Sequence, residues 1–386
     1  MSTIFSAVPE AKSELGKPRF LSPTAAVKVS PLCLGAMSIG EAWSDWMGSM
    51  NKEQSFKLLD AFYEKGGNFI DTANNYQDND SENWLGEWMV ERGNRDHLVI
   101  ATKYTTNYKA IDMGKTPHSV NYGGNGKKSL HVSFRDSLKK LQTDYVDILY
   151  VHWWEYAASV KEIMDALHEL VAQGKVLYLG VSDTPAWVVS AANEYANAAH
   201  KTPFSIYQGR WNVLIRDFER DILPMARTYG MALAPWDVMG GGKLQTKKQL
   251  EERKKANEGL RSFHGADQSP EQEKMSATLE KIAGQIGVES IQAVALAYVM
   301  QKAPYVFPII GGRKVEHLED NIKSLAIHLS DDHIKEIEGV VAFDTGFPHN
   351  MVGPDPRTVP AEQATMVKMQ TYNLQWQLDG KPIGHE

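Results

Sequence analysis

Val146-Asp147-Ile148-Leu149-Tyr150-Val151-His152 is a short β-rich run that ends at a polar residue. The run is too apolar for a half-exposed strand, so it predicts a parallel strand buried on both faces. Seven further runs are similar: residues 32–34, 68–70, 98–102, 176–181, 205–207, 231–234 and 306–310. We therefore expect eight strands, most of them buried in a parallel sheet.

Amphipathic stretches separate these runs. Residues 53–65 carry a broad apolar face and stop at Gly66-Gly67, and residues 160–173 repeat apolar positions at helical spacing before Gly174. The alternation of strand and helix predicts either a (β/α)₈ TIM barrel or a doubly wound parallel sheet. The pattern alone leaves both architectures open.

Three segments interrupt the alternation. Residues 104–128 are rich in glycine and predict a long loop after the third strand, and residues 237–274 form a second insertion after the seventh. Residues 343–386 hold several prolines and few periodic positions, which is typical of a surface tail. No repeat or low-complexity linker divides the chain, so we expect one domain, residues 1–342, with the tail 343–386 packed on it.

Composition and charge exclude several classes of protein. Of 386 residues, 42% are hydrophobic and 23% charged, as in ordinary globular domains. Lys and Arg number 41 against 48 Asp and Glu, and the resulting charge of −7 offers no basic field for nucleic acid. The single cysteine, Cys33, excludes an internal disulfide and any cysteine-cluster metal site.

The same features set an expected location. No apolar run approaches the roughly 20 residues of a membrane-spanning helix, and the N-terminus has no uninterrupted signal-peptide core. One cysteine fits a reducing compartment. We therefore expect a cytoplasmic protein that contacts neither membrane nor nucleic acid, and the sequence sets no oligomeric state.

Polar residues close many of the strand runs. Asp71, Lys103 and His152 each follow one, and Tyr76 lies in the loop just after Asp71. The later runs end at Ser182, Asp183 and Gln208. In a barrel the carboxyl ends of the strands meet at one mouth, where catalytic groups gather. Singly, such residues are more often caps, structural ion pairs or core histidines, and only their joint placement favours a functional site.

These residue types suit proton transfer to a carbonyl oxygen. A tyrosine with the ordinary pKa of about 10 is a poor acid at neutral pH. A Lys103 ammonium beside Asp71 is expected to favour the phenolate and so to lower the pKa of Tyr76. A neutral His152 would donate a hydrogen bond to the same oxygen. The set contains no evident nucleophile, which argues against acyl transfer and covalent glycoside hydrolysis.

The motifs resemble a known family. Phe69-Ile70-Asp71-Thr72-Ala73-Asn74-Asn75-Tyr76, Ala101-Thr102-Lys103, Val151-His152 and Gly180-Val181-Ser182-Asp183 are similar to the signatures of the aldo-keto reductase superfamily, in the same order over roughly residues 30–330. Leu34-Gly35-Ala36-Met37-Ser38-Ile39-Gly40 and Ala234-Pro235-Trp236-Asp237 resemble the fungal aryl-alcohol dehydrogenases in particular. The resemblance implies a single-domain (β/α)₈ barrel and a catalytic tetrad of Asp71, Tyr76, Lys103 and His152. Tyr76 would donate the proton in carbonyl reduction and accept it in alcohol oxidation.

The resemblance also implies residues that hold the nicotinamide cofactor. Ser182, Asp183 and Gln208 would bind the carboxamide, although many members have asparagine, which also donates, at the position of Asp183. The family's usual stacking tyrosine is replaced by Pro235-Trp236, and Trp236 would either stack on the nicotinamide or face the substrate. Further implied contacts are Gly35, Ala36, Met37, Asp237 and, along the pyrophosphate, Gly240, Gly241, Gly242 and Lys243.

A phosphate site would decide NADP(H) over NAD(H). Gly311-Gly312-Arg313-Lys314 opens a helical stretch, and a cation at a helix start favours phosphate. Matched to the family, Arg313 and His317 would bind the 2′-phosphate beside Gly311, with Asp320 and Asn321 near the adenine. The family's frequent Lys-Ser is absent from this loop. No GxGxxG follows a strand, so a Rossmann site is not indicated, and no HExxH or EF-hand pattern occurs.

Several tryptophans follow strand ends or lie in early loops: Trp43, Trp46, Trp153, Trp154 and Trp211. Their rings would line an apolar mouth for a benzaldehyde-like ligand, or would only pack loops. We expect NADP(H)-dependent interconversion of aryl aldehydes and primary aryl alcohols. The alternatives are a ketoreductase of polyketide or other secondary metabolism, a non-catalytic NADP-binding regulatory subunit, and a metal-dependent hydrolase.

Overall fold

Eight parallel strands form one sheet in the computed structural model, which describes residues 10–47, 49–110, 118–256 and 268–358 together with 366, 382 and 383. The sheet order is β10-β3-β4-β5-β6-β7-β8-β9. The bounds are β3 (Cys33–Gly35), β4 (Phe69–Asp71), β5 (Val99–Tyr104), β6 (Val146–Val151), β7 (Val176–Ser182), β8 (Phe204–Arg210), β9 (Ala232–Trp236) and β10 (Ile309–Ile310). Each predicted run overlaps one of these strands.

The sheet closes on itself between its two outer strands. The Leu233 amide in β9 donates to the Tyr305 carbonyl at 2.9 Å, and the Phe307 amide donates to the Leu233 carbonyl at 2.8 Å, just before β10. A doubly wound sheet would leave these edges open. The fold is therefore a (β/α)₈ barrel, as predicted.

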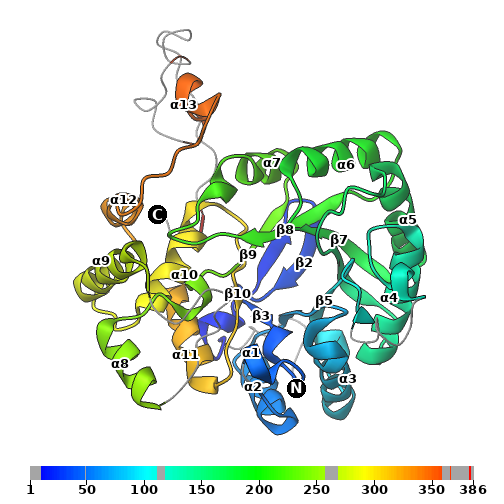
Figure 1. The fold of residues 1–386 in the computed structure, drawn as a ribbon, viewed down its shortest axis with the longest axis horizontal. Helices are drawn as coiled ribbons and strands as arrows, with labels where there is room; N and C mark the ends of the chain where they lie inside the picture. Colours follow the sequence, from blue (N-terminus) through cyan, green and yellow to red (C-terminus); the bar gives the residue numbers. More distant parts are fainter. Residues whose placement is uncertain are drawn as a thin grey trace, which may run out of the picture.

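Helices surround the barrel and alternate with its strands (Figure 1). Their bounds are α1 (Ser44–Met47), α2 (Lys52–Glu64), α3 (Asp80–Arg92), α4 (Lys127–Leu141), α5 (Val160–Ala172), α6 (Ala186–Ala198), α7 (Ile222–Thr228), α8 (Lys247–Ala256), α9 (Pro270–Ile286), α10 (Ile291–Lys302), α11 (Val315–Lys323), α12 (Asp331–Glu338) and α13 (His349–Val352). Local sequence explains several starts: Asn51 with Gln54 and Ser269 with Gln272 form capping boxes at α2 and α9.

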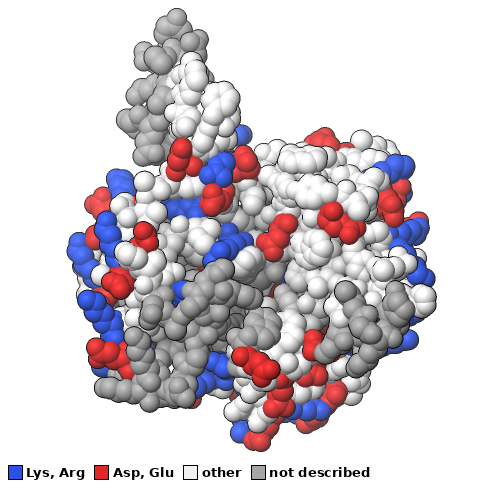
Figure 2. All heavy atoms as spheres, in the orientation of Figure 1, with Lys and Arg blue, Asp and Glu red and all other residues white. Residues whose placement is uncertain are grey.

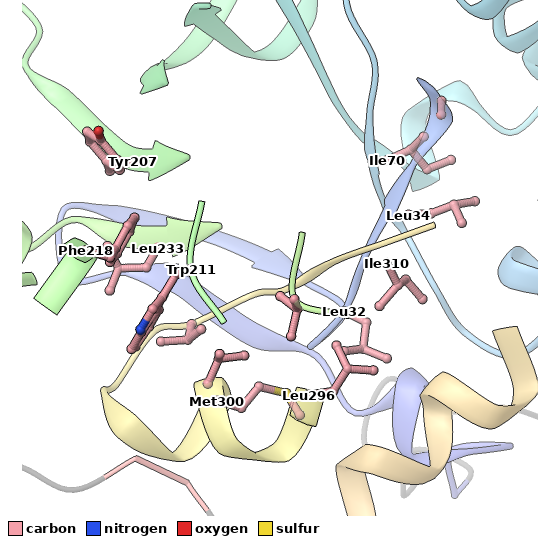
Figure 3. Packing of buried hydrophobic residues seen from close by; sticks show 14 of the residues in the cluster. Leu32, Leu34, Ile70, Tyr207, Trp211, Phe218, Leu233, Leu296, Met300 and Ile310 are labelled. Atoms are coloured by element: carbon pink, nitrogen blue, oxygen red, sulfur yellow. The ribbon is translucent and has the colours of Figure 1, made fainter. Parts of the chain in front are cut away.

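Two hydrophobic layers hold the barrel together. An inner cluster fills the barrel and includes Phe69, Ile148 and Phe307. A larger outer cluster lies between strands and helices, and in Figure 3 Leu296 and Met300 point from α10 toward the strands. Residues buried on both faces of the strands explain why the strand runs are almost continuously apolar.

A β-hairpin precedes the barrel and was not predicted. β1 (Arg19–Ser22) pairs antiparallel with β2 (Ala25–Val29). Leu21, Ala25 and Val29 are buried and belong to the inner cluster. The hairpin thus plugs the barrel from outside the parallel sheet, and the polar strand ends lie at the carboxyl mouth.

The predicted insertions contain regular elements. A 3-10 turn, Ser119–Tyr122, lies within the glycine-rich stretch after β5, and α8 and the start of α9 lie in the insertion after β9. In the tail, α13 stands beyond the outline of the barrel, on the side of α7 (Figure 1). Most residues after 358 lie outside the described part, so packing of the whole tail on the barrel stays a prediction.

The face of the molecule seen in Figure 1 carries mixed charge. Figure 2 shows Lys and Arg interspersed with Asp and Glu over this face. Within the described ranges, no single helix is long and apolar enough to cross a membrane, and only α9 and α10 taken together, across an 88° bend, reach the required length and composition.

Candidate active site

Neighbouring strand ends bring four side chains together at the barrel mouth. Asp71 ends β4, Lys103 lies near the end of β5 and His152 directly follows β6, while Tyr76 comes from the loop after β4. Lys103 is fully buried and Asp71 almost so. The parallel register explains the convergence, since Asp71 lies opposite Ala101 and Lys103 opposite Tyr150.

Lys103 is the centre of this cluster. Its ammonium forms an ion pair with Asp71 Oδ1, donates to the Thr72 carbonyl at 2.8 Å and lies 3.4 Å from the Tyr76 hydroxyl. Three acceptors match the three ammonium protons. Because Lys103 donates to the Tyr76 oxygen, the phenolic proton must point elsewhere and is available to another acceptor.

The pKa of Tyr76 differs from the expected direction. Burial raises the pKa of Tyr76 above its ordinary value, and although the Lys103 ammonium opposes this, Asp71 and Asp183 add to the rise. The prediction of a lowered pKa was wrong because it counted the cation and not the desolvation. For Lys103 itself, burial disfavours the ammonium, but Asp71 and Tyr76 outweigh it and its pKa is raised. The cluster therefore holds a charged lysine beside a protonated phenol.

His152 completes the cluster as a neutral ring. Its imidazole meets the Tyr76 ring edge-on, with centroids 5.8 Å apart. Burial and the Lys103 charge lower the pKa of His152 well below its usual range. Nδ1 lies 3.4 Å from the Thr106 hydroxyl, which leaves Nε2 as the ring nitrogen with no protein partner in the described ranges.

Gln208 has a role that the sequence did not indicate. Its side-chain amide nitrogen donates to Asp71 Oδ2 at 3.0 Å, so both carboxylate oxygens of Asp71 are engaged. This bond uses one of the two N–H groups of Gln208, so the second N–H and the carbonyl oxygen remain for the predicted carboxamide contact. The same hydrogen bond fixes Asp71 as the partner of Lys103.

The turn that carries Tyr76 has an unusual backbone. Gln77, Asp78 and Asn79 all have left-handed φ values, at 50°, 50° and 91°. Such conformations are strained for residues with a side chain, and they persist only where the surroundings fix them. The Gln77 amide supplies part of this hold, because it donates to the Met37 carbonyl at 3.0 Å and accepts from the Trp43 amide at 2.9 Å.

The predicted aromatic residues fall into two groups. The Trp43 ring lies edge-on to Tyr76, with centroids 6.2 Å apart, and Trp153 is 39% exposed with its indole nitrogen donating to Thr106 at 3.1 Å. Trp154 instead packs against the outer hydrophobic cluster, and buried Trp211 stacks on a neighbouring ring. Trp43 and Trp153 are thus beside the tetrad, while the assignment of Trp154 to the substrate pocket is not supported. The Trp46 side chain is outside the described part.

Trp236 spans the ends of β7 and β9. Its indole nitrogen donates to Asp183 Oδ1 at 3.1 Å, and the Arg210 guanidinium lies over its ring at 5.8 Å. Pro235 is buried in β9. Of the two candidates for the stacking position, Trp236 is therefore the one that reaches the mouth. Desolvation raises the pKa of Asp183 to about 6, and the hydrogen bond from Trp236 and the Lys103 charge only partly oppose this rise.

The residues around Ser182 fit a nicotinamide. Ser182 is 1% exposed, and its hydroxyl makes no hydrogen bond of regular geometry among the described residues, although it lies near enough to Asp183 to help hold down the pKa of that carboxyl. A buried hydroxyl of this kind has room for a partner from outside the protein. Further along, Gly240, Gly241 and Gly242 all have left-handed φ, which permits close backbone approach, while Asp237 is paired with Arg210 at 2.6 Å.

The residues predicted to bind the phosphate and adenine end of the cofactor differ in how well they fit that role. Arg313 is half-buried just before α11 and forms no ion pair within the described ranges, so its guanidinium is available to a phosphate. Asp320, by contrast, accepts from the Ser290 hydroxyl and pairs with Lys323, so it fixes the start of α10. The other residues expected here are half-buried Gly311, exposed His317 and buried Asn321.

Near β3, the residues implied as cofactor contacts also have roles within the protein. A Cβ on Gly35 would lie 2.8 Å from Ile309, so this glycine permits the pairing of β3 with β10. The carbonyl of Ala36 accepts from the Ser81 hydroxyl at 2.8 Å, as that of Met37 accepts from Gln77. Within the described residues, no group of three His, Cys, Asp or Glu side chains is placed to hold a metal ion.

Comparison with known proteins agrees with this geometry. The family model described as "Aldo/keto reductase family" matches residues 31–342. A putative aryl-alcohol dehydrogenase of Saccharomyces cerevisiae is 62% identical over 92% of this chain and 95% of the relative. An aryl-alcohol dehydrogenase [NADP(+)] of Phanerodontia chrysosporium is 54% identical over 91% and 92%. Norsolorinic acid reductase B of Dothistroma septosporum is 54% identical over 86% and 84%.

Proposed function

The chain belongs to the aldo/keto reductase family and is an oxidoreductase, and from this premise we propose that it interconverts aromatic aldehydes and primary aryl alcohols with NADP(H). Tyr76 is the proposed proton donor in reduction and the acceptor in oxidation. The observation that carries the proposal is the Lys103 ammonium 3.4 Å from the Tyr76 hydroxyl, within the buried cluster at the mouth.

The proposed chemistry divides between the protein and its cofactor. NADPH, when bound, supplies the hydride that adds to the carbonyl carbon. Tyr76 supplies the proton to the carbonyl oxygen, and Lys103 stabilises the negative charge left on the phenol. His152, neutral at physiological pH, donates to the same oxygen from Nε2 and so orients the carbonyl. Asp71 and Gln208 keep Lys103 in place.

The cofactor preference rests on residues at the two ends of the site. The buried Ser182 hydroxyl fits the carboxamide, and Arg313 fits the 2′-phosphate that distinguishes NADP from NAD. The Phanerodontia relative carries NADP(+) in its name, which supports the same preference. We expect Arg313→Ala to weaken NADPH binding by about tenfold or more, the loss of a charge-assisted hydrogen bond, and to leave NADH binding nearly unchanged.

The aryl substrate class is supported by two observations. Trp43 and Trp153 lie beside the tetrad, and two of the relatives are named aryl-alcohol dehydrogenases. The proposed setting is the cytoplasm, where a largely reduced NADP pool favours aldehyde reduction. The similarity to norsolorinic acid reductase B supports a second candidate function, that of a ketoreductase of secondary metabolism.

A substrate panel run with NADPH and NADH in parallel tests these proposals. Loss of NADPH absorbance is followed with substituted benzaldehydes and with polycyclic ketones. We expect faster turnover with NADPH and with the benzaldehydes. Preference for the ketones would favour the ketoreductase, and tight NADPH binding without turnover on any carbonyl would favour a regulatory subunit.

A further inference from the structure

We propose that Lys140, held by Glu82, is a positioning residue for the general acid: its ammonium clamps both flanks of the turn that carries Tyr76. The proposal rests on the proposed function, and it adds a residue from an outer helix that does not touch the reacting groups. It concerns the geometry of the Tyr76 phenol and not the binding of the cofactor.

The Lys140 ammonium bridges two points on either side of Tyr76. It donates to the Asn74 carbonyl at 2.8 Å and to Asn79 Oδ1 at 2.9 Å, which lie before and after Tyr76 in the sequence. Its third partner is Glu82 Oε2 at 2.5 Å. All three ammonium protons therefore have acceptors, and two of these acceptors belong to the turn.

Glu82 is itself fixed in a buried network. Its side chain is fully buried, and its carboxylate accepts from the Thr102 hydroxyl at 2.5 Å and from Ser137 at 3.2 Å. Thr102 precedes Lys103 in β5, so the network ties α3 and α4 to the strand that carries the central lysine. A buried carboxylate of this kind fixes the direction in which Lys140 points.

The turn needs such a clamp because of its backbone. Gln77, Asp78 and Asn79 are consecutive left-handed residues, a conformation that would relax if its surroundings released it. Relaxation would move Tyr76, which directly precedes them. The hydroxyl is already 3.4 Å from the Lys103 ammonium, so a small displacement breaks that contact.

The first experiment compares two adjacent lysines of α4. Lys140→Met removes the clamp, and Lys139→Met, at an exposed position, is the matched control. We expect Lys140→Met to lower kcat for aldehyde reduction by about 10- to 100-fold, as displaced catalytic groups do. The Kd for NADPH should stay within about twofold, because no cofactor contact is assigned to Lys140. Wild-type kcat in a folded Lys140→Met variant would overturn the proposal.

A double-mutant cycle separates positioning from a merely structural role. If Lys140 acts through the Tyr76 phenol, Lys140→Met costs little further activity in a Tyr76→Phe background. Single-turnover rates of NADPH oxidation provide the measurement. A loss of the same size in both backgrounds would overturn the proposal, because it would show that Lys140 affects the reaction independently of the phenol.

A milder variant and a readout independent of catalysis complete the test. Asn79→Ala removes one acceptor and leaves the Lys140–Glu82 pair intact; we expect kcat to fall several-fold with unchanged NADPH binding, and wild-type kcat would contradict the clamp. Amide hydrogen exchange of residues 72–79 should be faster in Lys140→Met than in Lys139→Met. If the wild type reduced no aldehyde, the proposed function would fail, whereas unchanged exchange would defeat the clamp alone.

Discussion

The carboxylate of Asp183 is the charged group at the mouth whose protonation changes near neutral pH. Its pKa is raised to about 6, whereas the pKa of His152 is lowered well below its usual range, Tyr76 stays protonated and Lys103 stays charged. Of these four groups, only Asp183 changes its protonation state between pH 5.5 and 7.5. Above pH 6 it is an anion beside the proposed nicotinamide site.

This charge should bias the binding of the two cofactor forms. An anion favours the cationic ring of NADP⁺ over the neutral ring of NADPH, by about fivefold for an interaction of roughly 1 kcal/mol in water. In the wild type, the NADP⁺ affinity relative to NADPH should therefore fall as pH drops from 7.5 to 5.5. Tryptophan fluorescence titrations measure both Kd values. Asp183→Asn should show a low, flat ratio, and a wild-type ratio independent of pH would contradict the role of the charge.

At the residue scale, the positions of the site residues were easier to predict than the burial and hydrogen bonding around them. Asp71, Lys103 and His152 could be placed together because parallel strands present their carboxyl ends at one mouth. The direction of the Tyr76 pKa could not, since it depends on how much protein surrounds the phenol. The hydrogen bond from Gln208 to Asp71 joins residues 137 positions apart, and no local pattern signals it.

Helices α3 and α4 pack closely because one residue at their contact, Gly86, has no side chain. A Cβ on Gly86 in α3 would lie inside contact distance of the α4 backbone, at Lys140 and 2.7 Å from the Leu141 carbonyl carbon. The close approach brings Glu82 of α3 next to Lys140 of α4. Gly284 in α9 is the contrasting case, because no atom lies within 4 Å of a Cβ placed there.

The two helical glycines should respond to alanine in opposite directions. Gly86→Ala should destabilise the protein by about 1–3 kcal/mol through overpacking against backbone, while Gly284→Ala should stabilise it by about 0.5–1 kcal/mol through helix propensity. Urea unfolding curves give both free energies. A shift of the same sign in the two variants would refute the packing argument.

At the scale of elements, the barrel strands were predictable and the plug was not. Strands buried on both faces have almost continuous apolar runs, which stand out in the sequence. The β1–β2 hairpin buries Leu21, Ala25 and Val29 but keeps Phe20 and Lys28 outward, so its pattern is short and mixed. Its partners are residues of the barrel interior, and nothing near it in sequence indicates them.

Across the whole molecule, charged side chains attach the C-terminal segment to the barrel. The guanidinium groups of Arg216 and Arg220 both contact the Phe343 ring, at 5.1 and 5.4 Å from its centroid. Arg220 also donates to the carbonyls of Asp344 and Thr345, both at 3.0 Å. The predicted domain boundary at residue 342 thus falls where the chain is still tied to the barrel.

Loss of this attachment should be visible by proteolysis. In Arg220→Ala, chymotrypsin should cleave after Phe343 at least about fivefold faster, since two hydrogen bonds of roughly 0.5–1.5 kcal/mol each are lost. Mass spectrometry of timed digests locates the cut. Arg135→Ala, an exposed arginine of α4, is the control. Equal cleavage of the two variants would show that Arg220 does not hold the segment.

The single-turnover rate of Tyr76→Phe tests the central claim most directly. The enzyme is saturated with NADPH, mixed with an aromatic aldehyde and followed by NADPH absorbance, with the Kd for NADPH measured separately. Removal of the phenolic proton should lower the rate by about 10²- to 10⁴-fold and leave cofactor affinity unchanged. A near-wild-type rate in this variant would contradict the assignment of Tyr76 as the proton donor.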